Sequence, residues 1–517
     1  IFSFDYTVDL GLFGEIGVAG GIGIFGNVVF ELNATETGVG GDIIEGIKWV
    51  EGKGSSTLGG RAWGKGAFFI SISVEGEAGI TVTIYVPKPY WRGKESLELF
   101  AGIKVTVKIP ILGSFNIIDK SVSWPSHYNE TSTGWHWIPR LWAVPGYSEY
   151  VWPPGAVEGV FLNKTYIYAH PSVAEQGGAV VLVWVHDDLS KPHVKGYEIY
   201  YSVWDDEAKK WSSPAPITDD FLHQGDPVVA FDRNGKAVCV WGEITDPGVN
   251  NTTNPLEVLR SVELAYSVWD PATGTWSKPE KVTRNTAYEM AHGLFKGTNG
   301  DLVLVWISDE DADLSTAEDW TIYVSRWTGT SWSEPMAVAR GVRITTPPTA
   351  TTLGDKIVVA WCQHTDGNFT TLNDTEVYYA LYDGARWSGP KRLTNDYVED
   401  EYSALTSTEE LGVVLVSVKR GFNDTLVFYR LEGEEFGEAT PIITRPRIAW
   451  PTAGVNSVGE LVVTWLDGLR QTPVLMTLYR GNASWIGPLE LTNTSLYQRD
   501  YSLAFTGDGR VVVAEIA

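Results

Sequence analysis

The chain has 517 residues and a formal net charge of −25 at pH 7, with a pI of about 4.7. So acidic a chain is a poor partner for nucleic acid, and its length leaves room for two to four domains. It holds no apolar run long enough to cross a membrane, so we expect no membrane span.

Residues 1–125 form the first predicted domain. They open with a glycine-dense stretch and continue in short runs that alternate apolar and polar residues, such as Ile80 and Val82 against Thr81 and Thr83. This alternation gives a strand one buried and one solvated face. We therefore predict an antiparallel β-sandwich or barrel-like domain. Its glycine-rich start is either a flat edge strand that pairs with another subunit, or a strand inside the same sheet.

Residues 126–169 are rich in tryptophan and proline, and are predicted to link the two domains and to help close the ring described below. Four tryptophans of this segment are expected to pack at the junction of the two domains: Trp135, Trp137, Trp142 and Trp152. The alternative is that they form a solvent-facing platform for sugars.

Residues 170–517 repeat one unit. The apolar run VVLVWV at 180–185 returns six times in degenerate form, 48 to 65 residues apart, with equivalent positions at Trp184, Trp241, Trp306, Trp361, Ser417, Trp465 and Glu515. Most copies are followed by a run ending in aromatic residues, a tight turn, and a segment of the pattern W-S-x-P-x-x-x-T, such as 276–283. A small-residue segment precedes most runs. One unit therefore holds four short strands.

A unit of four short strands is typical of the blade of a β-propeller. The second strand is apolar at nearly every position, which predicts burial on both faces, and the proline of the fourth strand predicts an edge. We predict a seven-bladed propeller with the strand order inner, buried, outer, edge. The seventh copy holds only two strands, so a segment ahead of the first copy must complete it. Residues 134–141 and 159–168 are the two candidates.

The two cysteines, Cys239 and Cys362, fall in the buried strands of non-adjacent units. That separation is beyond disulfide reach, so we predict two buried free thiols.

The repeat resembles the sialidase-type, BNR or Asp-box-like β-propeller repeats of secreted proteins, over about residues 150–517. The Asp-box S-x-D-x-G-x-x-W is not matched, and 270–276 comes nearest with a different spacing. For the enzymes of that family, the resemblance implies an arginine triad that grips a carboxylate, a tyrosine nucleophile and acidic residues. The family's Arg-Ile-Pro motif is missing here. The residue types themselves occur at Arg343, Arg447 and Arg499, with Tyr402 or Tyr501.

In the predicted strand order, the loops from strand two to strand three and from strand four to the next unit share one face, called the loop-rich face below. On it, Asp309, Asp311 and Asp313 alternate along one loop, and hard oxygen ligands at such positions suit Ca²⁺. The loop lacks the glycine and the distal glutamate of an EF-hand, and a solvated acidic loop is the alternative. No cofactor is required by any other motif, and no catalytic residue is assigned.

Asn-x-Ser/Thr sequons are far denser than chance gives, which predicts a glycosylated extracellular surface. They lie at Asn33, Asn129, Asn163, Asn250, Asn251, Asn368, Asn373, Asn423, Asn482 and Asn493. Few Gln, Met and Cys residues fit a thermophilic organism, and the combination predicts an archaeal cell-surface protein.

Two functions follow. The first is an N-glycosylated cell-surface or filament structural protein and not an enzyme, with the N-terminal domain for anchoring or self-association and the propeller as a rigid display or binding module. The alternative is a sialidase-like glycoside hydrolase or a carbohydrate-binding adhesin that uses the loop-rich face.

Overall fold

The computed structural model describes strand paths from residue 2 onward and most side chains from 169 to 514. Side chains before 169 are outside the description, as are those of 189, 192–194, 209, 249–256, 313–319, 366–374, 457–458, 468–478, 480–484, 492–500 and 507–510. The fold is all-β, with one short described helix, α2 (Pro255–Leu259). Among the described residues, no helix has the length and apolar character needed to cross a membrane.

Six sheets follow one another along the repeat, and each is an antiparallel meander of four main strands. Their strands are β13–β16 (Ser172–Gln176, Ala179–Asp187, Tyr197–Asp205, Lys210–Trp211), β18–β21 (His223–Phe231, Ala237–Ile244, Val262–Asp270, Thr275–Trp276), β23–β26 (Tyr288–Lys296, Leu302–Asp309, Trp320–Arg326, Met336–Arg340), β27–β30 (Thr349–Leu353, Lys356–His364, Thr375–Tyr382, Lys391–Arg392), β31–β34 (Asp400–Thr408, Gly412–Lys419, Asp424–Glu432, Glu435–Phe436) and β36–β39 (Ile448–Val455, Leu461–Asp467, Val474–Arg480, Ser484–Glu490). Three short segments add to the outer strands: β17 (Ala215–Pro216), β22 (Glu280–Lys281) and β35 (Thr440–Arg445).

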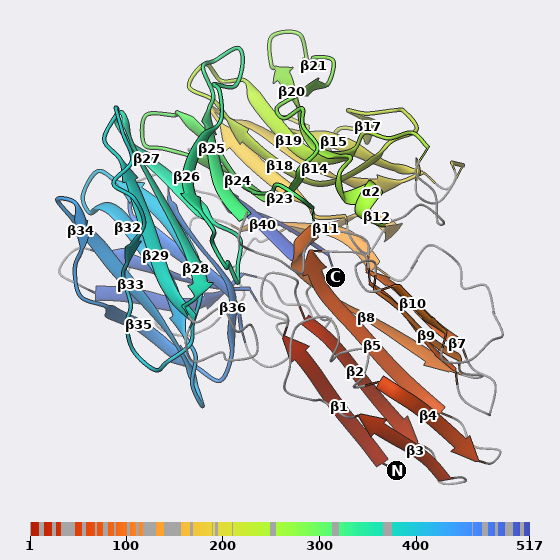
Figure 1. Cartoon of the computed structure of the whole chain (residues 1–517). Coiled ribbons are helices and arrows are strands. Elements are labelled where there is room, and N and C mark those ends of the chain that lie inside the picture. The colour runs from red at the N-terminus through yellow and green to blue at the C-terminus, as the bar shows by residue number, and fades with distance from the viewer. Residues whose placement is uncertain are drawn as a thin grey trace.

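A seventh sheet joins the end of the chain to residues ahead of the repeat. Its order is β12–β11–β41–β40, with bounds Val157–Thr165, Thr131–Ile138, Val511–Ile516 and Asp500–Phe505. The predicted pairing of the chain's end with earlier residues is therefore confirmed, and both candidate segments are used. Residues 131–138 pair directly with β41 as the outer strand, and 157–165 form the edge strand. In Figure 1 the C-terminus lies beside β11.

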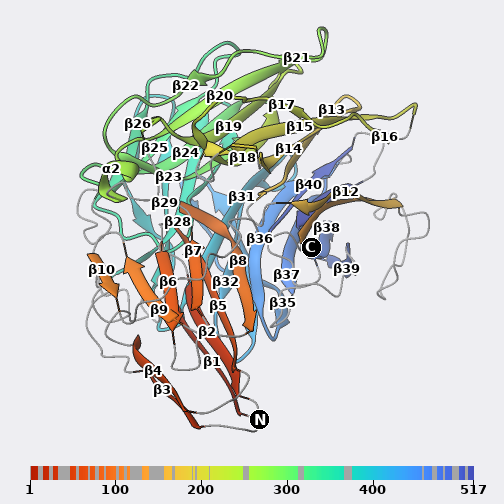
Figure 2. The same ribbon diagram turned by 90° about the vertical axis from the view of Figure 1, so that its right-hand side faces the viewer.

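The seven sheets stand around one axis (Figures 1 and 2). The first strands β13, β18, β23, β27, β31 and β36 contact one another in that order, and β40 contacts β13. Second strands such as β19 and β24 are buried along their whole length, as their apolar sequence predicts. Apolar cores fill the spaces between neighbouring sheets. One of them packs Val512 and Ala514 of the seventh sheet against Val180 and Trp184 of the first.

The pattern W-S-x-P-x-x-x-T fixes the edge strands. Proline interrupts the ladder there, and side-chain oxygens take the place of backbone acceptors. The serine Oγ accepts a hydrogen bond from the third strand, as from Val268 N to Ser277 at 3.0 Å. The threonine Oγ1 accepts a second one, as from Leu264 N to Thr283 at 2.9 Å. The same two contacts recur in other copies at Ser212, Ser333 and Ser388, and at Thr218 and Thr394.

Replacing Thr283 with valine keeps the shape of the side chain and removes the acceptor of the buried Leu264 amide. We expect a loss of about 1 to 2 kcal/mol in the free energy of unfolding, measured by urea denaturation. Thr440→Val, on an exposed position of β35, is the control. Equal stabilities of the two variants would show that the hydroxyl of Thr283 does not hold the strand.

Both cysteines are buried and free, as predicted. Burial raises the pKa of the Cys239 thiol, so it stays protonated and unreactive at neutral pH.

Residues 2–116 form antiparallel strands in three sheets. One sheet is β1–β2–β5–β8 (Phe2–Asp9, Glu15–Ile22, Leu58–Ala67, Pro89–Phe100), another is β10–β9–β6–β7 (Gly113–Asn116, Lys104–Ile109, Ile70–Glu75, Thr81–Val86), and a hairpin joins β3 and β4 (Asn27–Leu32, Ile47–Lys53). The glycine-rich strand β2 pairs with β1 on one side and β5 on the other. It is therefore a strand inside a sheet. Self-association through this region, the boundaries 1–125 and 126–169, and a sandwich architecture stay predictions.

Candidate functional site

A cavity runs along the axis of the seven sheets. Its volume is about 840 Å³, and first-strand residues of all seven sheets line it. This size is within the range of small-ligand sites. Much of the wall carries hydroxyl groups, from residues such as Ser172, Thr349, Thr406, Thr452 and Ser502. Such a wall offers many neutral hydrogen-bond donors and acceptors and few charges.

The first strands bulge where they meet the loop-rich face. In β18, β23, β31 and β36 the register shifts at one place, and a residue there has a positive φ that is unusual outside glycine. These residues are Asp226, Ala291, Tyr402 and Trp450, with φ of 55°, 52°, 61° and 48°. Left-handed backbone at non-glycine residues concentrates at functional sites, where the surrounding structure holds it in place.

Trp450 is the aromatic residue that this geometry presents most clearly. Its side chain is only partly buried and lines the cavity. The ring of Tyr402, which also lines the cavity, packs at 5.0 Å from that of Trp450. Tyr501 Oη donates a hydrogen bond of 2.8 Å to the Trp450 carbonyl, which holds the backbone of the bulge. The mouth of the cavity therefore carries a fixed aromatic surface.

A buried arginine supports this aromatic surface from behind. Arg420 forms ion pairs with Glu401 and Asp424 and donates a hydrogen bond of 2.7 Å to the Ile448 carbonyl. Its guanidinium lies 5.4 Å from the centre of the Tyr402 ring. The arginine thus ties the fifth and sixth sheets together where Tyr402 and Trp450 meet.

The opposite wall of the mouth is polar. His292 Nε2 lies 2.9 Å from the backbone oxygen of Asp226, and both residues line the cavity. Both are almost fully buried. The contact joins the second and third sheets as Arg420 joins the fifth and sixth.

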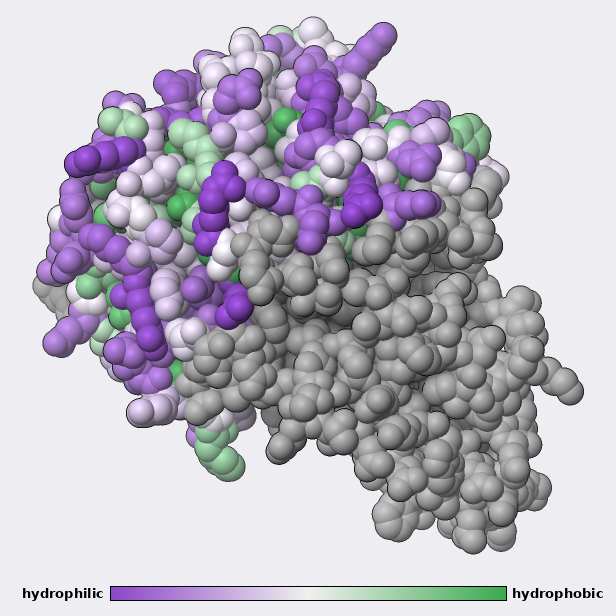
Figure 3. All heavy atoms as spheres, in the orientation of Figure 1, coloured by the Kyte–Doolittle hydropathy of each residue, from purple (hydrophilic) through white to green (hydrophobic). Residues whose placement is uncertain are grey.

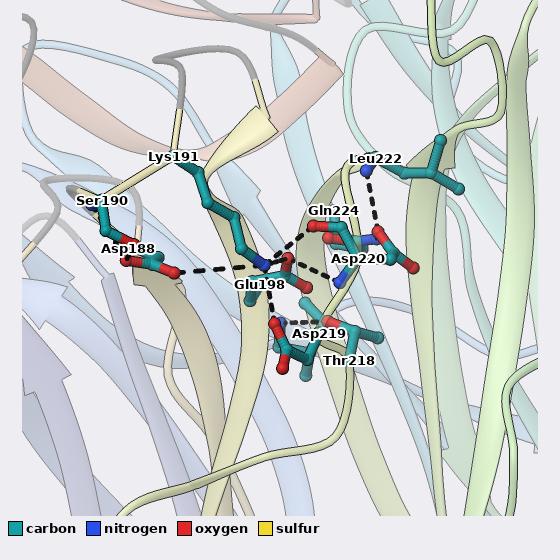
Figure 4. A network of polar contacts seen from close by, with 10 residues as sticks. Asp188, Ser190, Lys191, Glu198, Thr218, Asp219, Asp220, Leu222 and Gln224 are labelled. Carbon is teal, nitrogen blue, oxygen red and sulfur yellow. Dashed lines mark hydrogen bonds and ion pairs between the residues drawn. The ribbon is translucent and has the colours of Figure 1, made fainter.

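Around the mouth, buried acidic residues hold the loops between sheets. Glu198, at the start of a third strand, accepts hydrogen bonds from Lys191 Nζ at 2.6 Å and from the Asp220 amide at 3.0 Å. The same ammonium reaches Asp219 at 2.8 Å, and Asp220 Oδ1 accepts the Leu222 amide at 2.7 Å (Figure 4). Burial raises the pKa of Glu198, and its bonds with Lys191 oppose that rise.

The same arrangement recurs in two further loops. Glu263 accepts the Asn285 amide at 2.5 Å, and Glu376 accepts the Asp396 amide at 3.0 Å. The sequence signal is T-x-[D/N]-x-x-x-[Q/E/D], found at 218–224, 283–289 and 394–400. Sequence reasoning missed it because each loop looked like an ordinary acidic turn.

The last position of this pattern is buried in all three loops, and in two of them it is acidic. Burial raises the pKa of Glu289 to about 7 and that of Asp400 to about 6. Lys419 compensates Asp400, with an ion pair of 3.3 Å, and also pairs with Asp396 at 2.8 Å. Glu289 instead accepts a hydrogen bond from Asn285 Nδ2 at 2.6 Å, and the nearby Glu263 raises its pKa further.

The predicted calcium residues lie apart from the cavity lining. Asp309 is buried, and its Oδ1 accepts the Ala312 amide at 3.0 Å, as in a turn. Asp311 is exposed, and Asp313 lies outside the described residues. Within the described part, three acidic residues lie close enough to one another to share an ion: Glu376, Asp396 and Asp400. Their negative charge is already compensated by Lys419, which pairs with Asp396, and by Arg392, which pairs with Glu376. Calcium at 309–313 stays a prediction.

Of the residues expected of a sialidase-like enzyme, the structure describes the side chains of Arg343, Arg447, Tyr402 and Tyr501. Tyr402 and Tyr501 line the cavity, but the Tyr501 hydroxyl is bonded to the backbone of Trp450. Arg447 lies 3.8 Å from Asp424, outside the cavity lining, and the lining does not include Arg343. Arg499 lies outside the described residues.

Of the ten sequons, Asn423 is described with its side chain, which is exposed in the loop between β32 and β33. Asn163 lies in β12, where only the strand path is described. The side chains of the other eight are outside the description: Asn33, Asn129, Asn250, Asn251, Asn368, Asn373, Asn482 and Asn493. Glycosylation stays a prediction.

Comparisons with family models and with curated protein sequences find no match. The chain is similar to solved structures of carbohydrate-related proteins. The BP39L lectin from Burkholderia pseudomallei is 14% identical, over 66% of this chain and 88% of the lectin, with a TM-score of 0.45. The PL25 polysaccharide lyase, an ulvan lyase, is 12% identical over 76% and 92%, with a TM-score of 0.44. The sialidase of Trypanosoma rangeli is 11% identical over 75% and 57%, with a TM-score of 0.35.

Proposed function

We propose that this chain is an extracellular carbohydrate-binding protein. Its seven sheets are the blades of a closed seven-bladed β-propeller, and a sugar binds in the axial cavity at the loop-rich face. The observation that carries the proposal is the partly exposed ring of Trp450, held at the cavity mouth on a left-handed bulge. Sugars present C–H groups on one face and hydroxyls on the edge, which suit an aromatic ring and a hydroxyl-lined wall.

Binding without hydrolysis is the better supported form of this function. A glycosidase needs a carboxylate pair or a carboxylate with a tyrosine, free to reach the scissile bond. Glu401 and Asp424 both pair with Arg420, whose guanidinium contacts the ring of Tyr402, and Asp226 is a buried acid of the cavity lining on the opposite wall. Glycosylation and an archaeal cell surface belong to the same proposal and rest on the sequons and composition.

Trp450→Ala should weaken binding of the sugar at least tenfold, because the ring supplies the apolar contact in the cavity. That factor corresponds to about 1.4 kcal/mol. The measurement is isothermal titration calorimetry with the best ligand from a glycan array. Trp387→Ala is the matched control, since Trp387 is also partly buried but packs against Tyr382, with which it forms an isolated bridge outside the cavity lining.

A Trp450→Ala variant that is folded and binds as tightly as the wild type would contradict the proposed site. Failure of the wild type to bind any glycan on the array would contradict the proposed function itself.

A further inference from the structure

We infer that the ligand is a neutral polysaccharide chain, which extends from the cavity across two exposed aromatic side chains of the loop-rich face, Tyr397 and Phe422. This inference rests on the proposed function and specifies it in two respects. The charge state of the ligand follows from the ion pairs of the face, and its length follows from the position of the two rings.

Six described cationic side chains at this end of the sheets lie in ion pairs. Each has an acidic partner: Lys191 with Glu198, Lys281 with Glu243, Arg392 with Glu376, Lys419 with Asp396, Arg420 with Glu401 and Arg445 with Asp467. A carboxylate or sulfate group on a sugar that binds at any of these six positions would have to take the cation from its acidic partner.

Such an exchange is unfavourable here because most of the partners are buried. Glu198 is 1% exposed and Glu376 is fully buried. Removing the cation from a buried ion pair leaves an uncompensated charge at low dielectric, which is strongly destabilising. Exposed acids such as Asp219 add repulsion toward an anionic chain. The same face imposes neither cost on a neutral sugar.

Exposed aromatic side chains indicate the length of the ligand. The described part of the chain exposes five large hydrophobic side chains: Phe221, Leu353, Tyr397, Val398 and Phe422. Four of them lie in loops of the loop-rich face, and Leu353 lies at the opposite end of its sheet. Tyr397 is 91% exposed and Phe422 is fully exposed.

Local contacts place Tyr397 and Phe422 beside the cavity mouth. The Arg420 amide donates a hydrogen bond of 2.8 Å to the Glu399 carbonyl, which joins the two loops that carry these rings. Arg420 also contacts the ring of Tyr402 at the mouth. The Tyr397 loop is held by its own bonds, since Asp396 accepts the Val398 amide at 3.0 Å and pairs with Lys419. Exposed rings on fixed loops lose little conformational freedom when a ligand stacks on them.

A protein partner fits this surface less well than a sugar chain. Apolar protein interfaces need contiguous patches of several hundred Å². The described part of the chain exposes five large hydrophobic side chains in all, and Figure 3 shows hydrophobic residues scattered among hydrophilic ones on the side in view. Acids such as Asp396 and Glu399 flank the separate rings. A sugar chain can stack its C–H faces on the rings, and its hydroxyl groups can donate hydrogen bonds to the acids.

The test compares dextran, mannan and xyloglucan with dextran sulfate and polygalacturonate, by affinity electrophoresis of the full chain. We expect binding to at least one neutral polysaccharide, at least tenfold tighter than to either anionic one, and insensitive to salt. Salt-dependent binding to the anionic polymers alone would overturn the inference and leave the proposed function standing. Binding to none of the five would overturn both.

Variants test the path of the chain. Tyr397→Ala and Phe422→Ala should each weaken binding of the polysaccharide three- to tenfold and leave binding of its disaccharide unchanged. Trp450→Ala should weaken both. Leu353→Ala, at the opposite end of the sheets, is the matched control. If Tyr397→Ala and Phe422→Ala bind the polysaccharide like Leu353→Ala, no chain crosses the two rings, whatever becomes of the cavity.

Discussion

Replacing Arg420 with methionine should lower the free energy of unfolding by about 3 to 5 kcal/mol. The guanidinium is buried between Glu401 and Asp424, and the Ile448 carbonyl accepts a hydrogen bond from it. Methionine fills part of the volume but leaves two acids without their buried cation. The loss should appear in urea denaturation at pH 7 as an earlier transition of the repeat region, because Arg420 joins two sheets.

Two controls separate the charge effect from a general loss of packing. Arg386 is 87% exposed and pairs with Asp383 at 3.8 Å within a turn, so Arg386→Met should leave stability unchanged. Adding Glu401→Gln and Asp424→Asn to Arg420→Met removes the uncompensated charges and should recover a large part of the loss. A single variant as stable as the wild type would show that the buried network is not needed to join the fifth and sixth sheets.

Replacing Glu289 with glutamine should stabilise the protein above pH 7 and have little effect near pH 4. In the folded protein burial raises the pKa of Glu289 from 4.5 to about 7. Between these values the unfolded chain releases a proton that the folded chain keeps, so the wild type loses stability as the pH rises through this window. By linkage, ionisation of Glu289 lowers the free energy of unfolding by roughly 3 kcal/mol well above pH 7. Glutamine does not ionise, so the variant does not lose this stability.

The measurement is the free energy of unfolding of the two proteins at pH 4 and pH 8. Glu438→Gln, at an exposed position, controls for the change of net charge. A gain of equal size at both pH values would point to a change in packing rather than to ionisation. A loss of stability at pH 8 would mean that Glu289 is stabilised as a charged group, against the effect of its burial. Asp400, with its pKa raised to about 6, contributes in the same direction in both proteins.

The repeat predicted much of the fold. The apolar run around Trp241, recurring along the chain, predicts a strand buried on both faces, and W-S-x-P predicts an edge strand because proline cannot donate to the ladder. The closing of the seventh sheet also follows from counting strands. The choice between 134–141 and 159–168 could not be made, because either run fits an outer strand and only the pairing shows that both are used.

The candidate site was much harder to predict. Trp450 is one of 23 tryptophans, most of which a propeller buries between its sheets, and composition does not separate a presented ring from a packed one. A positional signal exists, since His170, Asp226 and Trp450 each precede a proline at equivalent places and all have positive φ. Arg420 looked like a loop cation because its two partners lie on different strands, 19 residues before it and 4 after it.

The sheet shared by β11, β12, β40 and β41 has a consequence for how this protein can be divided. Two of its strands precede residue 170 and two follow residue 499. A cut at the start of the repeat would remove β11, one of the two neighbours of β41, and leave one edge of β41 unpaired, which invites pairing with another molecule. The natural unit of inheritance and of recombination therefore begins upstream of the visible periodicity, and any shuffling of this module between genes must carry residues 131–165 with it.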